Sequence, residues 1–245
     1  MISRERRGDV EIVRLDAPPL NLLGSPMIGA IADAMRAVAS QQPRVVVLHC
    51  SGAGADVREM AGLDGPSARR FITALHESCR TIRDLDAAVI AAIDGPCLGA
   101  HLEVAAACDL RIASDRSRFG MPEIKVGIPS VIDAWWIVRT CGLGHAAGLF
   151  FDGEMIDAAE AHRIGLVNRL VAGDDLDAEA TAWAERIARF APAGIAEQKR
   201  VLRDWTDETY REGVRRSIDR LVAAFESGQA REAMTAMLEK REPRF

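Results

Sequence analysis

Short apolar runs separated by turns set the pattern of the first half of the chain. Residues 9–15 alternate well enough to predict a strand with one buried face. Residues 45–48 and 87–93 are almost continuously apolar, which is typical of strands covered on both faces. A further strand is predicted at residues 109–113. These segments predict the strands of a buried sheet.

Helical spacing connects the strands. Ser25 and Pro26 predict an N-cap and first turn, and apolar residues then repeat at helical spacing up to Ser40. A second helix is predicted at residues 67–84, and a third starts near Gly99. Strands that alternate with helices predict a layered α/β domain with parallel pairing.

The composition changes after about Pro192. Residues 195–240 consist almost entirely of helix formers and predict amphipathic helices with charged outer faces. A terminal helical segment of this length packs on its own domain or against another subunit. We therefore expect a main domain over residues 1–191 and a helical C-terminal segment over residues 192–245.

Composition and charge narrow the class of protein. The chain has 245 residues, 49% of them apolar, so a sizeable core can form. A formal charge of -5 argues against nucleic-acid binding, which usually requires a basic face. Five cysteines without metal-site spacing are expected to be free thiols in a reducing compartment. No signal peptide or apolar run of spanning length is present, so we expect a soluble, cytoplasmic protein without membrane contact.

Two loops share a design that suits the binding of an anion. Each follows a buried strand, consists of very small residues, and leads into a helix: residues 51–56 after Leu48, and residues 95–100 after Ile93. Such turns let a ligand approach backbone N–H groups at a helix start. Two donors aimed at one point would form an oxyanion hole. A single turn of this kind is more often an ordinary strand-to-helix connection.

Two acids lie close to turns in apolar surroundings. Glu103 falls in the first turn of the third predicted helix, and Glu123 follows Pro122. Taken alone, each acid is more simply interpreted as a solvated surface residue. Two carboxylates in one apolar site would separate their pKa values, so that one accepts a proton while the other donates it.

Other kinds of site are not indicated. Residues 52–54 lack the third glycine and the acidic residue of a dinucleotide fingerprint, and no Gly-x-Ser-x-Gly nucleophile elbow occurs. The histidines have no metal-ligand spacing. We therefore expect no metal and no bound cofactor.

Taken in order, several motifs resemble the crotonase (enoyl-CoA hydratase/isomerase) superfamily. They are AGADVREM at residues 53–60, GPCLGAHLEVA at 95–105, CDLRIA at 108–113, FGMPE at 119–123, GIP at 127–129 and DAAEAHRIGLVN at 157–168. The C-terminal residues 238–245 are also similar to the family's, so the resemblance covers essentially the whole chain.

The resemblance implies a fold and a chemistry. The fold would be a spiral of ββα turns with a C-terminal helical segment that builds homotrimers or homohexamers. The substrate would be an acyl-CoA thioester, whose coenzyme A is part of the substrate. Backbone N–H groups of Ala55 and Ala100 would form the oxyanion hole.

The resemblance also implies roles for side chains. Glu103 and Glu123 would be the two acids of the hydratase branch, with Glu123 supplying the proton to the α-carbon and Glu103 orienting and deprotonating water. Ala53, Asp56 and Arg58 would contact CoA.

The sequence departs from the family pattern at three places. The loop before Ala53 is shorter, Ala100 and His101 replace two glycines, and residues 130–136 replace a glycine-rich turn. His101 could point into the site or away from it. Ser130 could offer a backbone N–H to the water, and the paired tryptophans Trp135 and Trp136 could narrow the acyl pocket or pack in the core.

Three functions remain open at this point. The two acids favour an enoyl-CoA hydratase. The same oxyanion hole would also serve double-bond isomerisation, decarboxylation or thioester hydrolysis, since a fold does not select among reactions. A non-catalytic acyl-CoA-binding subunit is the third possibility. The acyl group and the choice between trimer and hexamer are not indicated.

Overall fold

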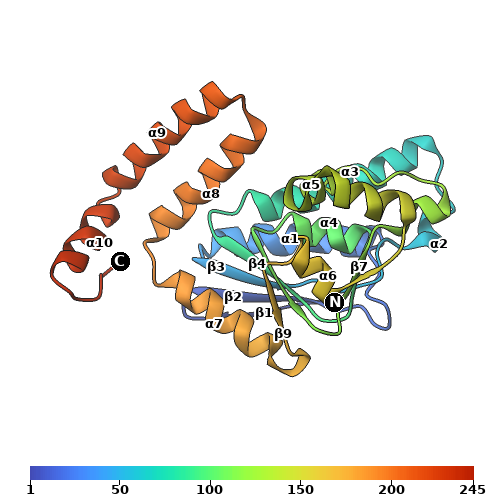
Figure 1. Ribbon diagram of the computed structural model, residues 1–245, viewed down its shortest axis with the longest axis horizontal. Coiled ribbons are helices and arrows are strands. Elements are labelled where there is room, and N and C mark those ends of the chain that lie inside the picture. The colour runs from blue at the N-terminus through green and yellow to red at the C-terminus, as the bar shows by residue number, and fades with distance from the viewer.

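A six-stranded sheet forms the centre of the computed structural model, which describes residues 1–245 (Figure 1). Its strand order is β1-β2-β3-β4-β6-β9, with β1 antiparallel to β2 and every other pair parallel. The strands are β1 (Ile2–Arg7), β2 (Val10–Leu15), β3 (Val45–His49), β4 (Ala88–Ile93), β6 (Leu110–Ser114) and β9 (Arg169–Val171). The predicted parallel α/β sheet is confirmed.

Helices cover both faces of this sheet. Val46 and Leu48 of β3 contribute to the larger core, against α1 (Ser25–Ser40) and α3 (Gly65–Arg83). Val45 and Val47 point to the other face, where they meet α7 (Leu176–Ala188). Side chains alternate between the two faces of a strand, so covering both faces requires the continuous apolar run found here.

A smaller sheet lies beside the main one and carries the loops of interest. It has the order β5-β7-β8, with β5 (Pro96–Leu98), β7 (Arg118–Gly120) and β8 (Ile156–Asp157). Isolated bridges pair Gly52 with Cys97 and Leu23 with Ala55. The loop after β3 is therefore held against the strand that leads into α4 (Ala100–Ala106).

The remaining short elements complete the domain. They are α2 (Val57–Met60), a 3-10 turn η1 (Pro122–Val126), α5 (Ala134–Asp152), α6 (Ala158–Arg163) and a second 3-10 turn η2 (Gly173–Asp175). Helix α5 changes direction at Gly142, whose φ of 81° is not helical.

Two sequence interpretations need correction. The charged N-terminal residues form the edge strand β1, which no apolar pattern predicts because its side chains are mostly exposed. The N-cap of α1 is Gly24 rather than Ser25; the Ser25 backbone N–H instead donates to Glu59 Oε2 at 2.9 Å.

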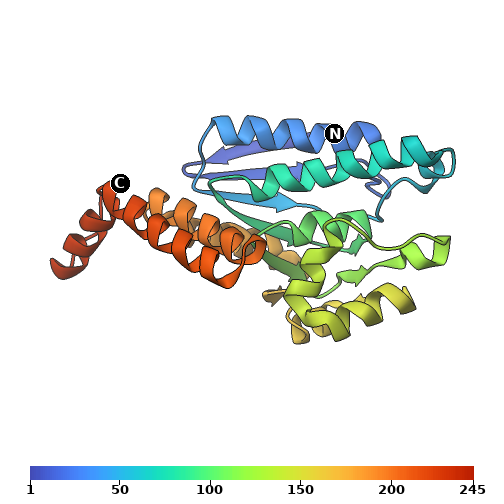
Figure 2. The same ribbon diagram turned by 90° about the horizontal axis from the view of Figure 1, so that it is seen from above.

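The C-terminal helices α8 (Pro192–Asp207), α9 (Tyr210–Glu226) and α10 (Gln229–Leu238) extend away from the sheet as an arm (Figures 1 and 2). Lys199 anchors the arm: its buried ammonium donates to Ile82 O at 3.1 Å and Ala87 O at 3.0 Å, and pairs with Asp109 at 2.9 Å. None of the helices has the length and apolar character needed to cross a membrane.

Candidate active site

Two backbone N–H groups face the same cavity from neighbouring loops. Ala55 lies in the loop after β3, and Ala100 is the first residue of α4; both line the cavity. Neither N–H donates to an acceptor within the protein. A Cβ added to Gly54 would lie 3.9 Å from Ala100 N, so the two loops nearly touch. Glycine suits this position, because the same Cβ would lie only 3.2 Å from Leu98 O and Gly54 has a positive φ of 96°.

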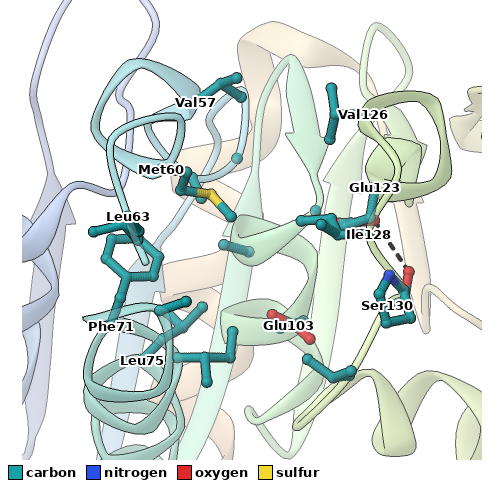
Figure 3. A pocket seen from close by; sticks show the side chains of 18 of the residues that line it. Val57, Met60, Leu63, Phe71, Leu75, Glu103, Glu123, Val126, Ile128 and Ser130 are labelled. Atoms are coloured by element: carbon teal, nitrogen blue, oxygen red, sulfur yellow. Dashed lines mark hydrogen bonds between the residues drawn. The ribbon is translucent and has the colours of Figure 1, made fainter. Parts of the chain in front are cut away.

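Glu103 projects from the first turn of α4 into the floor of the cavity (Figure 3). Glu103 is only 4% exposed, and its Oε1 accepts a hydrogen bond of 3.2 Å from Ala134 N–H. Burial raises the pKa of Glu103 well above its usual range, and the charges of Glu123 and Asp133 raise it further. A carboxyl in this environment is a strong proton acceptor.

Glu123 approaches from η1 on the opposite wall. Its Oε2 accepts a hydrogen bond of 3.1 Å from Ser130 Oγ (Figure 3). Its Oε1 lies over Gly99, where an added Cβ would come within 2.5 Å of it. Burial raises the pKa of Glu123, while the hydrogen bond from Ser130 opposes this rise. Glu123 is less buried than Glu103 and is the more easily ionised of the two.

The cavity itself is large and mostly apolar, with a volume of about 580 Å³. In Figure 3, one wall comes from α2 and α3 and the other from η1 and the segment after it. The labelled apolar side chains of the two walls are Val57, Met60, Leu63, Phe71, Leu75, Val126 and Ile128. Two cations, Arg69 and Lys125, also line the cavity.

The predicted CoA contacts divide into two groups. Ala53 lines the cavity, whereas Asp56 and Arg58 do not. The Asp56 carboxylate caps α2, because its Oδ1 accepts a hydrogen bond of 2.9 Å from Arg58 N–H. Arg58 is exposed beside the cavity and forms no ion pair.

His101 points away from the two acids. Its Nδ1 lies 2.8 Å from Cys50 O, and its Nε2 contacts Asn21 O. The Asn21 side chain in turn donates to Ser51 O at 2.6 Å. Burial lowers the pKa of His101, which favours a neutral ring. The structure therefore gives His101 a place between two loops rather than in the cavity.

The paired tryptophans also lie outside the cavity. Trp135 is 54% exposed. Trp136 packs against the main core, and the guanidinium of Arg83 lies 4.0 Å from its ring centre. Ser130, by contrast, lines the cavity, and its hydroxyl donates a hydrogen bond to Glu123 Oε2.

Sequence reasoning missed several residues around the acids. Ala134 supplies the backbone donor to Glu103, and the buried Asp133 beside it pairs with His76. Phe71 and Leu75, on the apolar face of the helix predicted at residues 67–84, also line the cavity. Helical spacing identifies an apolar face but does not say whether a neighbouring segment fills the space in front of it.

Comparison with known proteins places this geometry in a family. The family model for enoyl-CoA hydratase/isomerase matches residues 5–245. A probable enoyl-CoA hydratase of Mycobacterium leprae is 34% identical over 96% of this chain and 94% of its own length. A crotonyl-CoA hydratase of Syntrophomonas wolfei is 32% identical over 100% of this chain and 97% of its own length. The crystal structure of an enoyl-CoA hydratase of Mycobacterium smegmatis matches with a TM-score of 0.94 at 28% identity, over 99% and 98% of the two chains.

Proposed function

The chain belongs to the enoyl-CoA hydratase/isomerase family and has its crotonase fold, and from this premise we propose that it adds water to a trans-2-enoyl-CoA thioester. The product is a 3-hydroxyacyl-CoA. The observation that carries the proposal is the meeting of a buried acid, a half-buried acid and two free N–H donors in one cavity. The hydratase names of relatives at 32–34% identity support the same activity.

The N–H groups of Ala55 and Ala100 bind the thioester carbonyl oxygen. Attack of water on the β-carbon pushes electron density onto this oxygen, so the intermediate is enolate-like. Two prearranged donors stabilise that charge, and the loss of one donor typically costs about 2.7–4 kcal/mol of transition-state stabilisation.

The acids exchange protons with a water held between them. Glu103 takes one proton from the water, the oxygen bonds to the β-carbon, and Glu123 gives its proton to the α-carbon. The pair loses one proton and gains one, so its proton count is unchanged. Burial raises the pKa of both acids: it lets Glu123 hold the proton that it donates, and it makes the ionised form of Glu103 a strong base.

Substrate binding divides between the cavity and its rim. The apolar walls accept the acyl chain and the pantetheine arm, since cavities of this size and lining bury most of a ligand's surface. Arg58 would bind the CoA phosphates; its exposure and its lack of an ion pair support this role. Ala53 and Asp56 would contact CoA from the same loop.

Assembly into homotrimers, or hexamers of paired trimers, fits the arm of α8–α10. The arm exposes large apolar side chains, whose contact with other copies would remove them from water. They include Trp205, Ile218, Leu221, Val222, Phe225, Met237 and Leu238. Five buried, unpaired cysteines support a reducing, cytoplasmic compartment.

Loss of the conjugated thioester's ultraviolet absorbance tests the activity. We expect wild-type protein to consume a short 2-enoyl-CoA and Glu103→Gln and Glu123→Gln each to lose about 100-fold or more in kcat, the usual scale of general acid–base catalysis. Glu226→Gln, an exposed and unpaired site on α9, is the matched control. Labelled solvent oxygen must appear in the product. A product of unchanged mass would instead identify an isomerase, and wild-type rates in both variants would refute the roles of the acids.

A further inference from the structure

A third carboxylate lies behind the two acids and does not line the cavity. Asp133 is only 1% exposed and stands immediately before α5. Its Oδ2 is 2.8 Å from His76 Nδ1 on α3, whereas its Oδ1 is buried without any hydrogen-bond partner. An unpartnered buried carboxylate oxygen is costly, so the fold keeps Asp133 at this place at the expense of stability.

Asp133 is tied to Glu103 through one peptide unit. The next residue, Ala134, donates its N–H to Glu103 Oε1 at 3.2 Å. The pair of His76 and Asp133 therefore fixes the segment from which the Glu103 carboxyl group receives its only hydrogen bond from the backbone. Any shift of Asp133 would displace this donor.

The groups around the Glu103 carboxyl are almost all potential anions. They are Glu123 from η1, Asp133 from the start of α5 and the buried thiol of Cys79 on α3. His76 is the one group among these neighbours that can carry a positive charge, and it contacts Asp133 rather than Glu103. A negative charge behind Glu103 makes it harder to ionise and therefore a better acceptor of a proton.

We propose that Asp133, held by His76, is a positioning residue that directs the proton of the attacking water to Glu103. The inference rests on the proposed hydration. During the reaction Glu103 takes the water's proton and Glu123 gives one to the α-carbon. The negative charge of Asp133 destabilises the ionised form of Glu103 and so favours transfer of the water's proton to Glu103.

Removing the charge of Asp133 tests the proposal through a pH profile. In Asp133→Asn the shape and the contact with His76 are retained while the negative charge is lost. The pKa of Glu103 should fall, so the pair loses its last proton at lower pH. We expect the alkaline limb of kcat to move down by about one pH unit. Asp133→Ser, which also removes the charge, should move it in the same direction. Asp152→Asn, an exposed site at the far end of α5, is the matched control and should leave the limb in place.

A second readout does not depend on turnover. The infrared C=O stretch of a protonated carboxylic acid reports the proton on Glu103 directly, and its disappearance in Glu103→Gln assigns the band. In Asp133→Asn this band should titrate away at lower pH than in wild type. An unshifted band overturns the proposal, as does a lower kcat with an unmoved limb, which would mean a purely structural role. Wild-type protein without hydratase activity would refute the proposed function, whereas the band would still show whether the charge of Asp133 holds a proton on Glu103.

Discussion

Substitution of Gly99 by alanine should disable the site while leaving most of the fold intact. Gly99 caps α4 with φ 51° and ψ -122°, a conformation that side chains rarely adopt. A Cβ added there would lie 2.5 Å from Glu123 Oε1 and 3.9 Å from Gly54 Cα. The Glu123 carboxylate must therefore rotate away, or the start of α4 must move and displace Ala100 N–H.

The expected magnitudes separate stability from activity. Holding alanine in this backbone conformation should cost about 1–3 kcal/mol of the free energy of unfolding. Loss of a placed proton-transfer group should reduce kcat by about 100-fold or more. Urea unfolding measures the first quantity, and the decay of enoyl-CoA absorbance measures the second.

Gly95→Ala is the matched control for this experiment. Gly95 also has a positive φ, 94°, but an added Cβ there would meet nothing within 4 Å. It should lose stability on the same scale and keep most of its activity. If Gly99→Ala retained wild-type kcat, or if Gly95→Ala lost as much activity, the contact between Gly99 and Glu123 would have no catalytic importance and the reasoning would be wrong.

Two further predictions follow from the walls of the cavity. Ser130→Ala removes the hydroxyl that donates to Glu123. Because that bond lowers the pKa of Glu123, its loss should raise this pKa and move the acidic limb of kcat/KM up by about one pH unit. An unmoved limb in a profile measured from about pH 4 to 10 would contradict the role of the bond. Trp135→Ala and Trp136→Ala should leave the preference among acyl-chain lengths unchanged in a substrate panel, since neither ring lines the cavity; a shift toward longer chains would show that one of them limits the pocket.

The central sheet could be predicted because its signal is local. A parallel strand covered on both faces must be apolar at every position, and β3 and β4 carry such runs. Strand β1 has no such signal, because an exposed edge strand tolerates the charged residues it contains. Its place depends on pairing with β2 rather than on its own composition.

The site was predictable only in part, since its parts come from distant segments. Glu103 and Glu123 carry no distinguishing signal by themselves, and the family resemblance located them. His76 and Asp133 are 57 positions apart, so no spacing indicates their contact. The direction of His101 could have been foreseen: residues i and i+2 of a helix do not share a face, so His101 and Glu103 must point apart.

The fit of His101 between its two loops depends on what is missing at position 52. A Cβ on Gly52 would overlap His101 Nε2 and would lie 2.7 Å from Asn21 O. Gly52 is thus a permissive residue: a relative with any larger side chain there could not accept the imidazole by a single substitution. The two positions are expected to change together during evolution, with glycine arriving first. Transplanting His101 into a relative should consequently succeed only when position 52 is made glycine as well.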